Sequence, residues 1–223
     1  MPHSQSFHAI VLKTYDVGEA DRLCVLFTRE RGRLLARAAG ARRVTSRLGG
    51  ALLPFRCLQV ELKEGSGGWV VAGATREGFQ GVRRVQGPGG VDEFMMLEEG
   101  IELLLRFVTD EGALPEVFDA TLAFIDICHG ESFGKAQDDN CAVLSYSFCL
   151  LHHLGLLPGE EEMKKIQELS PSERGFFRTC RSGNIIAPDS SCNHSRLTAL
   201  RSFLLGEQLS SPLKAADVVA AMT

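Results

Sequence analysis

Short runs of alternating apolar and polar residues fill the first 80 or so positions, and a period of two is typical of β-strands. The alternation is clearest at 57–63 (CLQVELK), where every second side chain is apolar. Polar or glycine-containing turns separate the runs, as at 65–68 (GSGG). The pattern predicts strands at 8–15, 21–28, 33–38, 52–63 and 68–74. Five short strands in so short a stretch indicate a small barrel.

After residue 90 the apolar period lengthens to three and four, which is typical of helices packed on one face. Three helices are predicted from Phe94, Leu97, Ile101, Leu104 and Leu105, from Phe118, Leu122, Ile125 and Ile127, and from Val143, Tyr146, Leu150 and Leu154. Capping residues predict further helix starts at Ser170-Pro171-Ser172-Glu173, at Ser195 and at Ser211-Pro212.

The two patterns meet at 87–90 (GPGG), a sequence that neither helices nor strands accommodate well. We therefore predict an α+β protein with a domain boundary at this point. Residues 1–86 are expected to form the barrel domain, and residues 91–223 a helical domain.

Several protein classes conflict with this composition. The first residues (MPHSQSFHAIVLKTYDV) lack the basic head and apolar core of a secretory signal, and no apolar run is long enough to span a membrane. Seven scattered cysteines, an odd number mostly among apolar neighbours, are typical of reduced thiols rather than of a disulfide framework. We expect a cytoplasmic protein with no membrane partner.

The formal net charge of −4 conceals an asymmetry between the two halves. Residues 1–84 contain 14 Lys and Arg against 7 Asp and Glu, a balance of +7, which leaves −11 for residues 85–223. The first half is therefore expected to attract polyanions, and the second to repel them.

Within residues 26–47, which we call the arginine segment, seven arginines face a single acid, Glu30. Guanidinium groups match phosphate oxygens and stay charged at any relevant pH, so the segment predicts contact with a nucleic-acid backbone. Surface charge that only serves solubility is the alternative, although it more often mixes both signs. Among the aromatic residues, Phe27 and Phe55 lie in apolar runs and are expected in the core, whereas Tyr15 and Trp69 are candidates for base stacking. The predicted nucleic-acid-binding set is Lys13, Tyr15, Arg22, Arg29, Arg31, Arg33, Arg37, Arg42, Arg43 and Arg47.

Six short motifs in order resemble the N-terminal region of RecO proteins: 9–12 (AIVL), 18–23 (GEADRL), 26–28 (LFT) with Gly32, 40–43 (GARR), 46–49 (SRLG) and 53–55 (LPF). The resemblance implies that the barrel is an OB-fold and that the protein is a bacterial, nucleoid-associated recombination mediator. It further implies binding of single- and double-stranded DNA and annealing of strands coated by single-strand-binding protein. RecR would be the partner in loading RecA.

The resemblance continues through 148–158 (FCLLHHLGLLP) and then departs from the family. Many relatives place two Cys-x-x-Cys pairs of a zinc finger after this point, whereas this chain continues with 159–166 (GEEEMKKI) and has no thiol before Cys180. We therefore expect a degenerate zinc-finger region at about 158–195 that lacks the four-cysteine site and holds no metal. Cys180, Cys192 and His194 are interpreted as ordinary residues, and Met163, Ile166, Leu169, Phe176 and Phe177 as the apolar packing that replaces the metal.

No common catalytic or nucleotide-binding motif occurs in the sequence, so we expect neither an enzyme nor a cofactor. The main hypothesis is a non-catalytic DNA-binding mediator. An adaptor whose arginine-rich barrel binds an acidic protein, and a metal-dependent hydrolase, are the alternatives.

Overall fold

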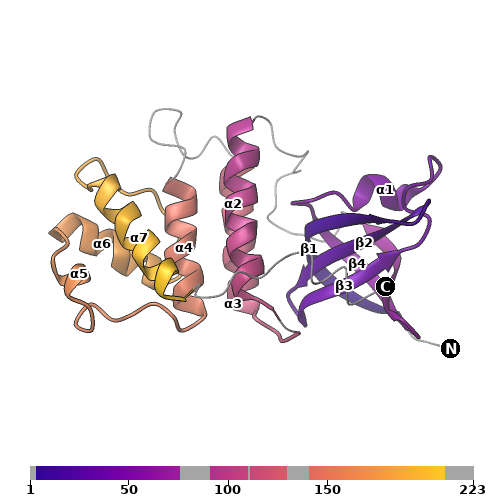
Figure 1. Cartoon of the computed structure of the whole chain (residues 1–223), viewed down its shortest axis with the longest axis horizontal. Coiled ribbons are helices and arrows are strands. Elements are labelled where there is room, and N and C mark those ends of the chain that lie inside the picture. The colour runs from indigo at the N-terminus through magenta and orange to yellow at the C-terminus, as the bar shows by residue number, and fades with distance from the viewer. Residues whose placement is uncertain (1–3, 76–90, 110, 130–140, 209–223) are drawn as a thin grey trace.

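The computed structural model describes residues 4–75, 91–109, 111–129 and 141–208, and Figure 1 shows a barrel followed by helices. The strands are β1 (Gln5–Val17), β2 (Asp21–Thr28), β3 (Gly32–Ala38), β4 (Cys57–Gly65) and β5 (Gly68–Thr75). The helices are α1 (Arg47–Ala51), α2 (Val91–Phe107), α3 (Pro115–His129), α4 (Cys141–His153), α5 (Lys164–Gln167), α6 (Pro171–Arg181) and α7 (His194–Gln208). The predicted fold class, a five-stranded barrel followed by helices, is confirmed. Within these ranges, no helix is both long and apolar enough to cross a membrane.

Strand β1 closes the barrel because its 13 residues pair with β2 on one edge and with β4 on the other. The strand order is β1-β2-β3-β5-β4, and the short β3–β5 pairing is parallel. A register shift between Val11 and Lys13 lets β1 bend from one partner toward the other. Closure gives each described strand a neighbour on both sides, although β3 and β5 share only two residue pairs.

Both faces of β1 and β2 are apolar, and each face has its own partner. One face fills the barrel interior with Phe7, Ala9, Val11, Cys24 and Leu26. The opposite face presents Ile10, Leu12, Val25 and Phe27 to the helices. The barrel therefore has two apolar surfaces, one of which only the helical part covers.

Helices α2 and α3 stand between the barrel and the remaining helices (Figure 1). Phe27 of β2 packs on Phe118 of α3 with ring centroids 5.8 Å apart, and Phe124 of α3 stacks on Tyr146 of α4 at 4.4 Å. Phe55 is buried in the same cluster, so the prediction that Phe27 and Phe55 belong to the core is confirmed. A continuous core thus joins the barrel to the helices.

The predicted strand at 52–63 begins five residues too early, because β4 starts at Cys57. The preceding residues form α1 and a turn in which Phe55 has a φ of +65° and donates its N–H to the Val11 carbonyl at 2.7 Å. Pro54 has no N–H for a strand ladder, and a left-handed residue next to it interrupts an extended chain. Leu52 and Phe55 are buried all the same, which explains the apolar pattern that misled the prediction.

The distal helices form a second core around Phe148 of α4, whose ring contacts Phe177 with centroids 5.4 Å apart. All five residues predicted to replace the metal belong to this core or pack against it. Ser170 and Glu173 form the predicted capping box of α6. The helix predicted to start at Ser195 is confirmed as α7, which begins slightly earlier, at His194. Asn193 rather than Ser195 accepts a bond from the Arg196 N–H, at 3.1 Å. The start predicted at Ser211-Pro212 lies outside the described residues.

All seven cysteines are free thiols, and five of them are buried: Cys24, Cys141, Cys149, Cys180 and Cys192. This agrees with the prediction of reduced thiols. Burial raises the pKa of the Cys24 thiol to about 11, so the thiol stays protonated at neutral pH.

The contact between α2 and α3 depends on Gly100, because a Cβ atom at this position would overlap with the Phe124 ring. We expect Gly100→Ala to lower the free energy of unfolding by about 1–3 kcal/mol, since the stacked ring cannot withdraw easily. Gly175→Ala in α6 is the matched control: its Cβ would meet open space, so the higher helix propensity of alanine should stabilise by about 0.5–1 kcal/mol. Denaturant unfolding of both variants measures the difference, and equal effects would contradict the close packing.

Candidate nucleic-acid interface

The β1–β2 turn and the β3–α1 loop lie together at one end of the barrel, held by Asp21. Its carboxylate accepts a bond from the Gly40 N–H at 2.7 Å and forms an ion pair with Arg37 at 2.6 Å. The Gly40 N–H, followed by the Arg37 guanidinium, lowers the pKa of Asp21 below its ordinary value. Arg37 thus holds the loop while its side chain stays more than half exposed.

Asp16 has a similar role on the other side of this loop. The Arg42 guanidinium lies 3.3 Å from its carboxylate and also donates to the Gly18 carbonyl at 2.9 Å. Arg22 lies 3.6 Å from Asp16 and donates to the carbonyls of Gly49 and Leu52, at the end of α1. Both arginines are therefore part of the loop's internal bonding.

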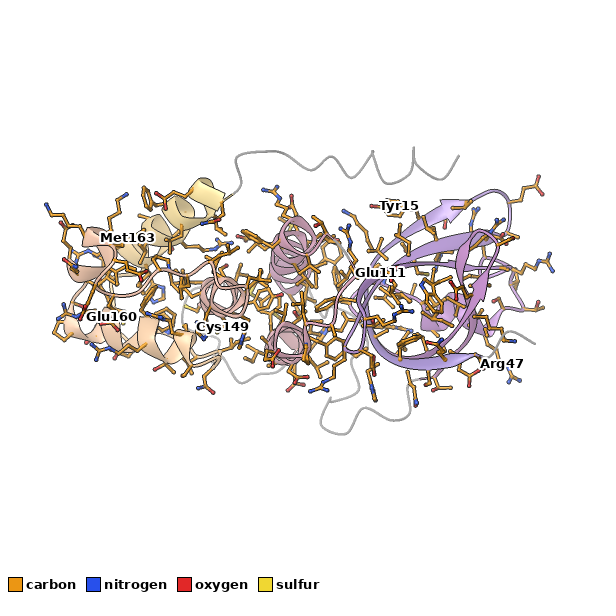
Figure 2. The ribbon with its side chains drawn as sticks, turned by 90° about the horizontal axis from the view of Figure 1, so that it is seen from below. Tyr15, Arg47, Glu111, Cys149, Glu160 and Met163 are labelled. Atoms are coloured by element: carbon orange, nitrogen blue, oxygen red, sulfur yellow. The ribbon has the colours of Figure 1, made fainter. Side chains whose placement is uncertain are left out.

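Arg43 and Arg47 differ from these arginines. Both are exposed, and among the described residues neither guanidinium group has a hydrogen-bond or ion-pair partner. Val44, which follows Arg43, is fully exposed. Figure 2 shows Arg47 at the end of the barrel farthest from the helices. We call residues 42–47 the basic loop, and its two unpaired cations have donors available for a ligand.

Arg29 and Arg33 lie instead between the barrel and the helices. Arg29 donates two bonds to the Asp119 carboxylate of α3, at 3.0 and 2.9 Å, and Arg33 donates to the Thr109 carbonyl after α2. The Asp119 carboxylate raises the pKa of Arg29. These arginines hold the two parts of the protein together.

Arg31 lies near them, at the β2–β3 turn. Its guanidinium carbon is 5.3 Å from the centre of the Trp69 ring, close enough for a cation–π interaction. The same ring contacts Phe7 edge-on, so Trp69 is half-buried rather than open for stacking. The Arg31 carbonyl accepts a bond from the Gly112 N–H at 2.9 Å.

Lys13 and Tyr15 lie on the outer face of β1 and are half-buried. Tyr15 packs against the core shared with the helices. Figure 2 shows Tyr15 and Arg47 on opposite sides of the barrel. A single flat ligand surface therefore does not contain the whole predicted set.

The structure thus divides the predicted set into three groups. Arg22, Arg37, Arg42, Arg43 and Arg47 gather at the basic loop, Arg29, Arg31 and Arg33 lie at the junction with the helices, and Lys13 and Tyr15 form a third position. Sequence reasoning did not identify the roles of Asp16 and Asp21, and it placed Asp21 only at the start of the strand predicted at 21–28 and in the motif at 18–23. It also missed Arg56, which donates to the Gly50 carbonyl of α1. Three acids at 16–21, in a half of the chain that is otherwise rich in arginine, are the signal that could have indicated these pairs.

Comparison with known proteins gives a family for the chain. Residues 1–69 match the family described as "Recombination protein O N terminal". The DNA repair protein RecO of Myxococcus xanthus is 30% identical over 185 residues, which cover 81% of this chain and 70% of that protein. The chain belongs to the RecO family of DNA repair proteins.

Other RecO relatives match over shorter stretches. The DNA repair protein RecO of Anaeromyxobacter sp. (strain K) is 35% identical over 67% of this chain, which spans only 56% of that relative. The RecO protein of a Nocardioides species is 54% identical over 57 residues, which is 26% of this chain. The predicted membership of the RecO family is confirmed.

The region in which RecO resemblance predicts a degenerate zinc finger contains α5 and α6. Cys180 lies within 3.4 Å of the Ser145 hydroxyl, whereas the His194 ring lies 3.6 Å from the Cys141 sulfur. Cys192 instead donates its backbone N–H to the Asp189 carbonyl. In the described part of the chain, no three His, Cys, Asp or Glu side chains gather in a way that could hold a metal ion.

The Asp21 contacts predict a defined pH dependence for this RecO chain. Because the folded pKa of Asp21 lies below the ordinary value of 3.8, its contribution to stability is present at neutral pH and is lost as the pH falls through the folded pKa. We expect Asp21→Asn to melt at a lower temperature than the wild type at neutral pH, with the difference shrinking below about pH 4. Glu19→Gln, an exposed acid in the same turn, is the control. A neutral-pH melting temperature unchanged by Asp21→Asn would show that the loop does not depend on this carboxylate.

Proposed function

We propose that this RecO-family protein is a non-catalytic recombination mediator that binds single- and double-stranded DNA through the basic loop. The observation that carries the proposal is the pair of exposed arginines, Arg43 and Arg47, which have no ion-pair partner among the described residues. Arg37 and Arg42 precede them in the chain and remain partly exposed while holding the loop in place. Such a preorganised group of guanidinium donors fits phosphate oxygens without reading bases.

The proposal assigns three different roles to the arginines of the predicted set. Arg43 and Arg47 bind the backbone, Arg22, Arg37 and Arg42 position the loop, and Arg29 and Arg33 join the barrel to the helices. Lys13, Tyr15 and Arg31 remain candidates for secondary strand contacts. In the cytoplasm, the protein neutralises the phosphate charge of two strands so that they can pair. It cooperates with RecR and single-strand-binding protein in loading RecA.

Salt dependence tests the basic loop directly. Each phosphate contact contributes about 0.9 to the slope of log affinity against log salt, so Arg43→Ala with Arg47→Ala should flatten that slope by about 2. Arg29→Ala is the control, because its guanidinium is already bonded to Asp119 and should leave the slope unchanged. Fluorescence anisotropy of a labelled oligonucleotide from about 50 to 200 mM salt gives the slopes. Equal slopes for the wild type and the double variant would remove the loop from the DNA site.

Annealing tests the mediator role. We expect the protein to accelerate pairing of complementary strands, bare or coated by single-strand-binding protein, because neutralised backbones repel each other less. The Arg43→Ala, Arg47→Ala variant should anneal more slowly with an unchanged melting temperature, since exposed arginines without partners contribute little to folding. Strand pairing followed by energy transfer between labelled oligonucleotides measures the rate.

The alternative, an adaptor that binds an acidic protein, predicts a different result. An adaptor of this kind would have little affinity for oligonucleotides of any length. Wild-type protein that neither binds DNA at low salt nor accelerates annealing would replace the mediator proposal with this alternative.

A further inference from the structure

The acidic half of the chain contains a cationic portion of its own. Residues 164–201 carry seven Lys and Arg against three Asp and Glu, a balance of +4, within a half whose total is −11. Averaging over the half concealed this portion. It comprises α5, α6 and the first half of α7, at the end of the molecule opposite the barrel (Figure 1).

Three of these cations follow one face of α6. Arg174, Arg178 and Arg181 are spaced by four and three residues, which places them in a row on the helix surface. The side of α6 that carries Phe176 and Phe177 is buried in the distal core, whereas Arg178 is exposed and Arg174 and Arg181 are partly exposed. Like charges at this spacing destabilise a helix by a few tenths of a kcal/mol, although Arg178 and Arg181 also lie in the last turn of α6, where cations complement the helix dipole.

The chain's own carboxylate occupies the middle of this row. Glu160, which precedes α5, accepts two bonds from the Arg178 guanidinium at 2.6 and 2.8 Å. The Arg178 bonds, together with the charges of Arg178, Arg174 and Arg181, lower the pKa of Glu160. One acid thus lies among three arginines, in the two-pronged geometry that a phosphate would adopt.

The two arginines at the ends of the row form fewer polar contacts than Arg178. Arg174 donates to the Gln167 carbonyl at 3.2 Å, a neutral partner. The Arg181 guanidinium group has no hydrogen-bond or ion-pair partner within the described ranges. Arg178 itself is 67% exposed despite its bonds to Glu160. Arg174 and Arg181 therefore carry positive charges with no carboxylate bonded to them, on either side of the Arg178–Glu160 ion pair.

We propose that the arginine row of α6 is a second binding surface for a nucleic-acid backbone, and that Glu160 occupies it as an internal anion when no strand is bound. Figure 2 shows Glu160 and Arg47 at opposite ends of the molecule, so the row lies far from the basic loop. One protein can then hold two strand segments, one at each end. This surface is separate from the basic loop. The inference nevertheless depends on the proposed function, namely that the protein binds nucleic acid.

The dimensions of the row favour a nucleic-acid strand over an acidic peptide. From Arg174 to Arg181 the helix rises by about 10 Å, and a DNA strand presents a phosphate about every 3.4 Å of its axis, so the row can meet successive phosphates. The described pocket nearby, between α5 and α7, contains the apolar side chains of Leu169, Ala199 and Leu200 beside three charged residues, and no arginine of the row lines it. A peptide anchored by apolar side chains would therefore not be held at the row.

Two variants with opposite expected effects on oligonucleotide affinity test the proposal. Glu160→Gln removes the internal anion and should tighten binding of a fluorescein-labelled oligothymidylate by roughly two- to threefold at about 50 mM salt. Glu161→Gln makes the same change of charge at the neighbouring position and should have a smaller effect. Arg174→Gln with Arg181→Gln should weaken binding by roughly tenfold, and Lys164→Gln with Lys165→Gln is its charge-matched control on α5. Each variant is made in the full chain, alone and combined with Arg43→Ala and Arg47→Ala, and melting curves confirm folding.

The outcomes separate this inference from the basic-loop proposal. If the arginine variant binds as the lysine control does, or if Glu160→Gln does not bind more tightly than Glu161→Gln, the second surface is refuted while the loop can stand. If the loop variant alone has no effect, the loop proposal fails and the row remains the site. Displacement of the oligonucleotide from the loop variant by polyglutamate more readily than by unlabelled oligothymidylate would also overturn the inference, in favour of an acidic protein ligand.

Discussion

The apolar outer face of β1 and β2 cannot remain in water, and the arrangement of the rest of the molecule follows from covering it. Burying a side chain the size of Phe27 is worth roughly 1.5–3 kcal/mol, and this residue shares its face with Ile10, Leu12 and Val25. Helices α2 and α3 supply the cover, chiefly through Phe118. The polar contacts at the junction, including the Arg29–Asp119 pair, follow from this packing because they form only after the apolar surfaces meet. A half-exposed ion pair of this kind contributes little by itself, but it selects one orientation of the barrel on the helices.

The period of apolar residues was enough to predict the barrel and the helices, since each element buries at least one face. It failed at 52–56, where Leu52 and Phe55 are buried from a turn rather than from a strand, and a pattern of burial does not distinguish the two. It also did not reveal that β2 is buried on both faces, because the second partner comes from helices about 90 residues later in the chain.

The sequence indicated that arginines form the candidate site, but it did not indicate which arginines belong to it. Seven arginines in one segment correctly marked an unusual surface, yet the partner of each guanidinium is set by tertiary contacts. Arg29 and Arg43 look alike in sequence, whereas one is bonded to Asp119 and the other has no such partner among the described residues. The arginines of α6 escaped notice for a related reason: their charges were averaged with those of the acidic residues that precede them. Local counting over a single helix face would have found them.

Helix α4 contributes to both cores, with Tyr146 directed to the barrel side and Phe148 to the distal side, and every residue from 141 to 151 is buried. Side chains there have no room to vary without disturbing one neighbour or the other. During divergence of the family, α4 should therefore change more slowly than the exposed loops that contact ligands. An invariant position in this helix would be a record of packing, and comparison of sequences alone would mistake it for a sign of function.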